Sequence, residues 1–177
     1  ISREAYEISG FKLPYETIIK KFAGSDDEIY FNELLQVRFN GLTVITANDV
    51  SNAEKIVEEL RNNFVTSEIV NQIDDVRYTV LKQCKIEGFE IDGHLLKGML
   101  DLVHILHQEK KIIPYDLKCV WNIEGFLSDY YLYRRSYIQA LVYKKACEKL
   151  KKDMNLEDYS VENLNFIVCD SINYYNP

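Results

Sequence analysis

The sequence predicts a mixed α/β (α+β) protein, in which a central mixed sheet with an antiparallel three-stranded meander is flanked by helices. Three observations predict this fold class. Apolar residues recur at helical spacing over 46–62, alternating and β-branched residues fill 77–120, and helical spacing returns over 134–152. With 47% apolar and 28% charged residues in a chain of 177, the composition is typical of a packed globular protein rather than a disordered or fibrous one.

One domain is expected over 1–177, with a core over 46–177 and an N-terminal part, 1–45, in which the sequence patterns are weak. The chain has only 7 Gly and 3 Pro and no low-complexity tract, which argues against a flexible linker or a repeat array. It begins with isoleucine rather than methionine, so we expect a fragment of a longer chain.

The elements before residue 76 are predicted to be helical where the pattern is clear. Apolar spacing predicts a short helix over Tyr15–Phe22, whereas Glu33–Phe39 fits either a helix or a strand. Thr46 and Asp49 have the spacing of a capping box, in which each side chain accepts a hydrogen bond from the other residue's backbone N–H. The amphipathic helix that follows should end near Asn62.

Between residues 77 and 120 the pattern changes to that of β-strands. Arg77–Ile91 is rich in alternating and β-branched residues, and Asp92-Gly93 is a common signal for a two-residue hairpin turn. The return strand is expected over Leu95–Leu106. After the polar turn His107–Lys110, a third strand is expected over Lys111–Val120.

Two helical segments and one strand are predicted after the meander. The helices are expected over Glu124–Tyr131 and Arg134–Lys152, and the strand over Leu164–Cys169. This strand would complete the mixed sheet.

Charge is distributed unevenly along the chain. The formal net charge of −7 argues against a generally basic nucleic-acid binder. However, residues 1–75 hold 14 acidic and 7 basic side chains, whereas residues 76–177 hold 14 of each. An anionic partner should therefore meet the second part of the chain.

Neither membrane spans nor metal–thiolate clusters are expected. No apolar run approaches the roughly 18 to 20 residues that span a bilayer, so a soluble, cytoplasmic protein without membrane partners is predicted. The four cysteines lie 35, 28 and 22 positions apart, too far for the paired spacing of zinc or iron–sulfur sites. Reduced and mostly buried thiols are the simpler interpretation.

Two aspartates are predicted to face each other on the second and third strands of the meander. If these strands pair antiparallel through a tight turn at Gln108 and Glu109, Asp101 lies opposite Asp116. Opposed like charges destabilise a sheet unless a cation lies nearby or one partner has a raised pKa. Lys118 follows Asp116 by two residues, so its ammonium lies on the same face, near both carboxylates.

This arrangement is typical of a site for a hard cation next to an anionic substrate. Mg²⁺ prefers carboxylate oxygens and keeps several waters, which suits phosphodiester hydrolysis. Lys118 would position the water or offset the charge that develops on the phosphate. In the simpler alternative, the two aspartates lie at frayed strand ends and Lys118 is their ordinary ion-pair partner, because an Asp-x-Lys triplet alone is common.

Three segments resemble, in order, the successive motifs of the PD-(D/E)xK nuclease superfamily. They are Gly98–Asp101, Pro114–Lys118 and Gln139–Tyr143, the last resembling the Gln-xxx-Tyr helix of the RecB-like branch. Over about 45–172 the chain is most similar to phage and prophage DNA exonucleases of the exonuclease-eight type. The resemblance implies a restriction-endonuclease-like fold.

The resemblance also implies roles for individual residues. Asp101 and Asp116 would bind Mg²⁺ or Mn²⁺, with the backbone carbonyl of Leu117 as a further ligand. Lys118 would be the catalytic lysine.

Gln139 and Tyr143 are four residues apart and share one helical face whatever the family. In the family, this helix faces the active site and helps to orient metal ligands or DNA, so both residues are assigned to the catalytic site. The structural alternative is a half-buried helix position with the tyrosine packed against the sheet.

The sequence departs from the family at one motif. Family members carry a further acidic residue or a histidine on an upstream helix, in a Gly-xxx-His context that this sequence lacks, so that residue lies before Ile1 or is absent. Four glutamates could substitute for it, although a solvated helix face explains them better and none is assigned a role. They are Glu54, Glu58, Glu59 and Glu68.

A basic segment accompanies the predicted Gln-xxx-Tyr helix. Arg134, Arg135 and Lys144 lie on or near it, and Tyr137 lies between them. Phosphate contacts from such residues give sequence-independent binding, and tyrosines can stack on unpaired bases. The lysine run over 149–152 is explained equally well by the helix macrodipole.

Together these features predict a divalent-metal-dependent deoxyribonuclease that hydrolyses DNA phosphodiester bonds, an exonuclease in phage-type recombination or repair. DNA is the expected partner, and a homo-oligomer is left open. A catalytically inactive nuclease-like module that binds nucleic acid or a protein is the alternative from another class. A metal-free α/β binding domain is a second alternative, and it predicts that the two aspartates are not neighbours.

Overall fold

The computed structural model shows a mixed α+β protein, as the sequence predicts. Its contacts divide the chain into two compact units, Ile1–Val50 and Ser51–Pro177, whose boundary lies near the predicted limit between the N-terminal part and the core. The expectation that both form one domain stays a prediction. The structure describes residues 3, 6–7, 12–43 and 45–171.

Helices α2 and α3 lie in the first unit. The predicted helix α2, Tyr15–Phe22, is confirmed, and its apolar face buries Ile18. Helix α3, Asp26–Phe39, shows that the ambiguous segment before residue 40 is helical. The three acidic residues that begin α3 suit the positive end of a helix dipole, and the Glu28 carboxylate accepts a hydrogen bond from the N–H of Gly24 at 2.6 Å.

Helix α4, Ala47–Asn62, begins at the predicted capping box. The N–H of Asp49 donates to Thr46 Oγ1 at 3.1 Å, and the N–H of Thr46 donates to Asp49 Oδ2 at 2.8 Å. These bonds satisfy two backbone donors that a helix N-terminus leaves free. A short helix, α5, follows over Ser67–Val70.

The predicted meander is present as β1 (Tyr78–Ile91), β2 (His94–Leu106) and β3 (Lys111–Val120). Asp92 and Gly93 both have positive φ, 50° and 80°, which the two central residues of a type I′ hairpin turn require. Both pairs of neighbouring strands run antiparallel, as predicted.

The sheet continues beyond the meander with two strands parallel to β3. One is β5, Asn165–Asp170, close to the predicted last strand, and the other is β4, Ser160–Val161, a two-residue strand that the sequence did not predict. The result is a five-stranded mixed sheet. Because β3 and β5 are parallel, the chain must cross between them, and it does so through η1, Phe126–Tyr133, and α6, Ser136–Asp153.

Two predicted helix boundaries are corrected. The first segment after β3 is a π-helix, η1, which lies two residues later than the predicted helix. The second helix, α6, starts at Ser136 rather than Arg134, because Arg135 has a left-handed backbone (φ 58°) that a right-handed helix excludes.

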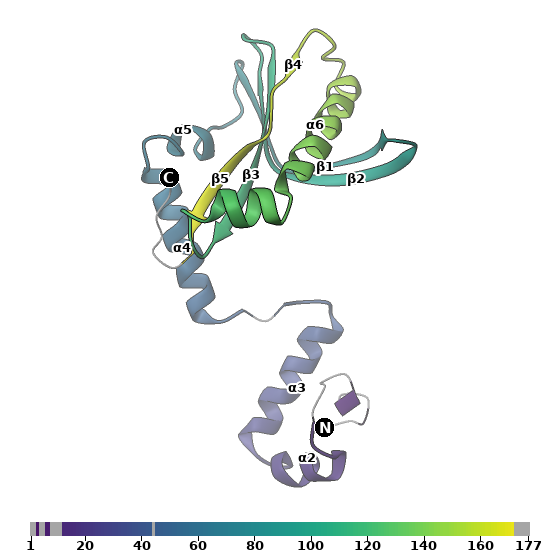
Figure 1. Ribbon diagram of the computed structural model, residues 1–177. Helices are drawn as coiled ribbons and strands as arrows, with labels where there is room; N and C mark the ends of the chain where they lie inside the picture. Colours follow the sequence, from purple (N-terminus) through teal and green to yellow (C-terminus); the bar gives the residue numbers. More distant parts are fainter. Residues whose placement is uncertain (1–2, 4–5, 8–11, 44, 172–177) are drawn as a thin grey trace. The chain divides into compact units, whose positions relative to one another are not determined.

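Helices cover both faces of the sheet in the second unit (Figure 1). Helix α6 packs on one face, over a core drawn from β1, β2 and β3, and α4 and α5 pack on the other. The buried members of the α6-side core are Ile86, Phe89, Leu100, Val103, Ile105, Ile112, Ala146 and Cys147. Those of the α4-side core are Leu60, Tyr115, Ile167 and Cys169.

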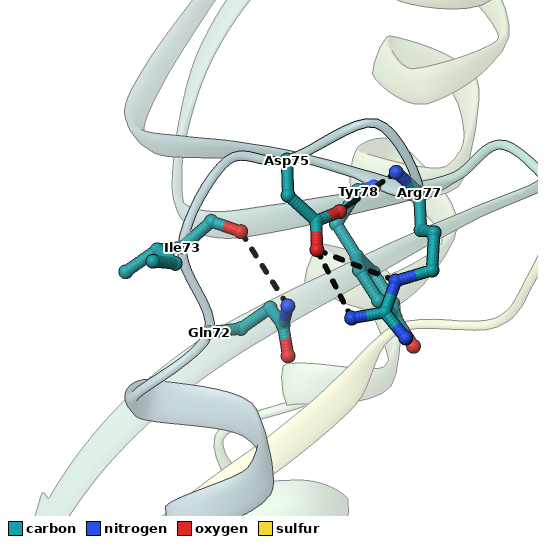
Figure 2. Close-up of polar contacts among 5 residues, drawn as sticks. All are labelled: Gln72, Ile73, Asp75, Arg77 and Tyr78. Atoms are coloured by element: carbon teal, nitrogen blue, oxygen red, sulfur yellow. Dashed lines mark hydrogen bonds and ion pairs between the residues drawn. The ribbon is translucent and has the colours of Figure 1, made fainter.

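The carboxylate of Asp75, in the loop from α5 into β1, bonds to the two residues at the start of the strand region, as Figure 2 shows. Asp75 Oδ1 accepts hydrogen bonds from the N–H groups of Arg77 (2.7 Å) and Tyr78 (2.9 Å). Its Oδ2 pairs with the Arg77 guanidinium at 3.1 Å. These contacts define where β1 begins, and β1 in turn carries residues that contact the candidate site.

Candidate active site

The register that brings the two aspartates together is the predicted one. Leu102 pairs with Tyr115 and Val103 with Pro114, so residues whose numbers sum to 217 face each other. The last described pair of the β2–β3 ladder is Leu102–Tyr115, and Asp101 and Asp116 lie one position beyond it. The two carboxylates are close enough that the charge of Asp101 raises the pKa of Asp116.

Asp116 is the buried centre of the site. Only 3% of the residue is exposed, although it carries a carboxylate. Its Oδ1 accepts a hydrogen bond from Gln139 Nε2 at 2.9 Å, and its Oδ2 lies 2.6 Å from Lys118 Nζ in an ion pair. Lys118 is thus on the same strand face as Asp116, as predicted, and the helix residue Gln139 reaches the same carboxylate.

The environment of Asp116 holds opposing electrostatic influences. Burial is the largest and raises the pKa of its carboxyl, because a charged group loses hydration there. Asp101 adds to this rise, whereas the Lys118 ammonium and the Gln139 amide lower the pKa. A cation beside the two carboxylates would relieve both their repulsion and part of the desolvation cost.

Asp101 is bound at the seam between β2 and β3. Its Oδ2 accepts a hydrogen bond from the backbone N–H of Leu117 at 2.8 Å, and its Oδ1 accepts one from Gln83 Nε2 at 3.4 Å. The peptide group between Asp116 and Leu117 therefore contacts Asp101 directly. Asp101 also lines a pocket of about 530 Å³ on the α4 side of the sheet, together with Lys82 and Gln83.

Gln139 and Tyr143 lie on the face of α6 that meets the sheet, as their spacing predicts. Gln139 reaches Asp116, and the hydroxyl of Tyr143 donates to the backbone carbonyl of Met99 at 3.0 Å. The second contact fixes the helix against β2, two residues before Asp101. Tyr143 therefore supports the site through the backbone rather than through a carboxylate.

The predicted DNA-contacting residues do not all lie in one place. Arg134 and Arg135 are exposed at the start of α6, and the Arg134 guanidinium lies 4.4 Å from the centre of the Tyr130 ring. Tyr137 is 37% exposed, with its ring 6.0 Å from that of Tyr131. These three residues lie two to five positions before Gln139 in the sequence.

Lys144 is placed differently from the two arginines. It lies more than two turns further along α6, and its ammonium donates to Asn163 Oδ1 at 2.9 Å, next to β5. At the end of the helix, Lys149 pairs with Asp153 and Lys151 lies 3.9 Å from Glu148. Such intrahelical pairs agree with a solvated helix end.

The upstream glutamates and His104 lie outside the site. The four upstream glutamates on α4 and α5 are exposed, as a solvated face predicts. His104 packs edge-on against Tyr115 on the sheet face opposite Asp116, with ring centres 5.0 Å apart. All four cysteines are free thiols, and Cys147 and Cys169 are buried as expected. Cys119 is exposed, so the expectation of a buried thiol is wrong for this residue.

Sequence reasoning missed Gln83, Phe166 and Asp170. Gln83 contacts Asp101 from β1, and the Phe166 ring lies beneath Lys118 Nζ, 5.9 Å away. Asp170 is 5% exposed at the end of β5. The contact of Gln83 depends on the pairing of β1 with β2, and that of Phe166 on the pairing of β3 with β5. Neither strand pairing can be read from the order of residues alone.

Within the described ranges, no three or more His, Cys, Asp or Glu side chains gather as a group that could hold a metal ion. The metal donors that the motif resemblance implies are two carboxylates, Asp101 and Asp116, and the backbone carbonyl of Leu117. Of the helices that the structure describes, none has the length and apolar character that crossing a bilayer demands.

No protein-family model, curated protein or solved structure matches this chain. The resemblance of the three motifs to a nuclease superfamily therefore stays a prediction.

Proposed function

We propose that the protein is a divalent-metal-dependent DNA hydrolase whose active site is centred on Asp101, Asp116 and Lys118. One observation carries this proposal. A buried carboxylate, Asp116, lies between a lysine from its own strand and a glutamine from a helix, with a second carboxylate on the neighbouring strand. A site that served stability alone would more simply hold apolar residues, because a buried charge costs free energy.

The donor atoms fit a hard cation such as Mg²⁺ or Mn²⁺. Both carboxylates supply oxygen, and the carbonyl of Leu117 belongs to the strand segment whose N–H already touches Asp101. Asp101, Asp116 and the Leu117 carbonyl would hold the ion. A bound cation supplies Lewis-acid chemistry, since it polarises a phosphodiester and lowers the pKa of water.

The surrounding residues supply positioning and charge. Lys118, with 25% of its side chain exposed, can offset the negative charge that grows on the phosphate during hydrolysis. Gln139 fixes the orientation of the Asp116 carboxylate, and Tyr143 fixes the helix that carries Gln139. The exposed Arg134 and Arg135 would contact phosphates of the DNA, and Tyr137 would stack on an unpaired base.

The motif resemblance adds finer expectations. It favours an exonuclease in phage-type recombination or repair, and DNA over other phosphodiesters. The local basic residues around the start of α6 are compatible with this, since the excess of acidic residues lies before residue 76.

Hydrolysis of linear duplex DNA in Mg²⁺ tests the proposal. We expect Asp116→Asn to abolish cleavage, and Lys118→Met to slow it by about 10²- to 10³-fold, the usual cost of removing one charge-stabilising group. The exposed ion pair Lys110–Asp158 (2.5 Å) offers matched controls, because Asp158→Asn and Lys110→Met make the same chemical changes elsewhere. These controls should cleave at the wild-type rate.

Cleavage that survives Asp116→Asn would refute the catalytic assignment. If the wild-type chain binds DNA but does not cleave it in Mg²⁺ or Mn²⁺, the inactive nuclease-like module is the better description. Circular and end-labelled DNA substrates, compared in the same assay, distinguish cuts at ends from internal cuts.

A further inference from the structure

Strand β1 contains a residue whose backbone does not fit a regular strand. Gln83, near the middle of Tyr78–Ile91, has φ 49°, in the left-handed region. This region is unfavourable for residues with a Cβ atom, and such residues concentrate at functional sites. The second irregularity of the strand, between Glu87 and Phe89, uses Gly88, for which a positive φ has no steric cost.

The pairing of β1 with β2 is interrupted at Gln83. The ladder passes from the Lys82–Leu102 pair to the Cys84–Leu100 pair, omitting Gln83 and Asp101, while the register stays unchanged. The residue across from the strained backbone is therefore the candidate metal ligand. Asp101 is left out of the β1 ladder and, by one position, out of the β3 ladder as well.

Both strands change faces at this point. Leu81 and Cys84 are three residues apart, yet both pack in the α6-side core, and the same is true of Leu100 and Val103. In a regular strand, residues three apart point to opposite faces. The switch lies between these residues, where β1 has Gln83 and β2 has Asp101.

The switch explains the contacts of Asp101. Freed from regular pairing, its carboxylate accepts the N–H of Leu117 at 2.8 Å. The Gln83 side chain then binds the other carboxylate oxygen at 3.4 Å. One residue thus acts on Asp101 twice, through its backbone conformation and, more weakly, through its amide.

We propose that Gln83 is a positioning residue: its left-handed backbone breaks the β1–β2 ladder opposite Asp101 and so sets the orientation in which Asp101 bridges to Leu117. The catalytic meaning of this orientation rests on the proposed function. The placement itself does not, and it can be measured without metal or DNA.

The test compares substitutions that tolerate a positive φ with substitutions that resist it. Gln83→Gly keeps the backbone and removes the side chain, whereas β-branched Gln83→Val disfavours the left-handed region, and Gln83→Ala does so more mildly. Lys85→Val, an exposed change on the same strand, is the matched control. Asp101→Ala defines the signal of a Leu117 amide that has lost its acceptor.

The first readout is the Leu117 amide in metal-free protein, by NMR. We expect Gln83→Gly and Lys85→Val to keep its chemical shift and its slow hydrogen exchange. Gln83→Val should move the shift toward that of Asp101→Ala and speed exchange by about tenfold or more, with Gln83→Ala in between. If the Val variant does not fold, the Ala–Gly comparison decides.

The second readout is Mg²⁺ affinity by calorimetry. We expect Gln83→Val to weaken binding about 10- to 100-fold, as substitutions behind metal ligands do, and Gln83→Gly about threefold or less. An unchanged Leu117 amide in both Gln83→Val and Gln83→Ala overturns the proposal, as does an equal change in Gly and Ala variants. If wild-type protein binds no Mg²⁺, the proposed function fails, while the amide readout still decides the role of Gln83.

Discussion

The hydrogen bond from Gln139 to Asp116 offers the sharpest test of the site through stability. Replacing Gln139 by leucine preserves most of the side-chain volume but removes the amide that donates a hydrogen bond to Asp116 Oδ1 at 2.9 Å. Because Asp116 is only 3% exposed, water cannot easily replace that donor. Leaving a buried acceptor unpaired costs about 1–3 kcal/mol, so the free energy of unfolding should fall by that amount.

A double-mutant cycle isolates this contact. Urea unfolding of wild type, Gln139→Leu, Asp116→Ala and the double variant should give a coupling energy of about 1–3 kcal/mol. Leu141→Ala is the control partner for Asp116→Ala, since Leu141 lies on the same helix and is 64% exposed. That pair should be additive within about 0.5 kcal/mol. Additive effects of Gln139→Leu and Asp116→Ala would refute the contact.

Three further predictions address the support, the pH dependence and the DNA contacts of the site. In urea unfolding, Tyr143→Phe should lower the free energy of unfolding by about 0.5–1.5 kcal/mol, because the hydrogen bond to the Met99 carbonyl is lost. The control Tyr137→Phe, at an exposed position, should change this free energy by less than about 0.5 kcal/mol. Burial lowers the pKa of His104 in the folded protein, so below about pH 6.5 the unfolded chain binds a proton at this histidine more readily than the folded protein does. The free energy of unfolding of wild type should therefore fall as the pH falls from about 6.5 through the lower folded pKa, by at most about 1.4 kcal/mol per pH unit. His104→Phe should lack this pH dependence. An equal slope in the variant would contradict that assignment. The affinity for DNA should be measured in metal-free buffer between about 50 and 200 mM salt. Arg134→Ala should reduce the slope of log K against log salt concentration by about one, the value for one lost phosphate contact, whereas Lys152→Ala, at the solvated helix end, should leave this slope unchanged.

The meander was predictable because its signals are local. Asp92-Gly93 specifies a turn with two positive φ angles, and the alternating strands on either side leave one register that buries the apolar face. The turn after β2 then sets the second register and with it the approach of Asp101 to Asp116. Fold class and the central pair of carboxylates therefore follow from sequence.

Other features depend on long-range contacts that sequence patterns do not report. The short strand β4 exists because the Ser160 N–H donates to the Lys110 carbonyl and the Glu162 N–H to the Ile112 carbonyl, and two residues carry no periodicity of their own. Lys144 donates a hydrogen bond to Asn163, which is also a long-range contact, and this contact separates it from the two arginines. These contacts form only once β3, α6 and β5 are assembled.

The strained backbone of Gln83 was also beyond sequence reasoning. Glycine or asparagine would have indicated a positive φ, and glutamine does not. Natural sequences break local rules mainly where function or tertiary structure requires it. The break at Gln83, opposite Asp101, therefore directs attention to the same place as the paired carboxylates.

The central claim is that Asp101 and Asp116 hold a divalent cation. A Mn²⁺ titration followed by NMR tests it most directly, because a bound paramagnetic ion broadens the signals of nearby nuclei. We expect the backbone amide of Leu117 and the side-chain amide of Gln139 to broaden first in wild type, and to stay sharp at the same Mn²⁺ concentration in Asp116→Asn. Broadening centred elsewhere, or unchanged by Asp116→Asn, would contradict the account.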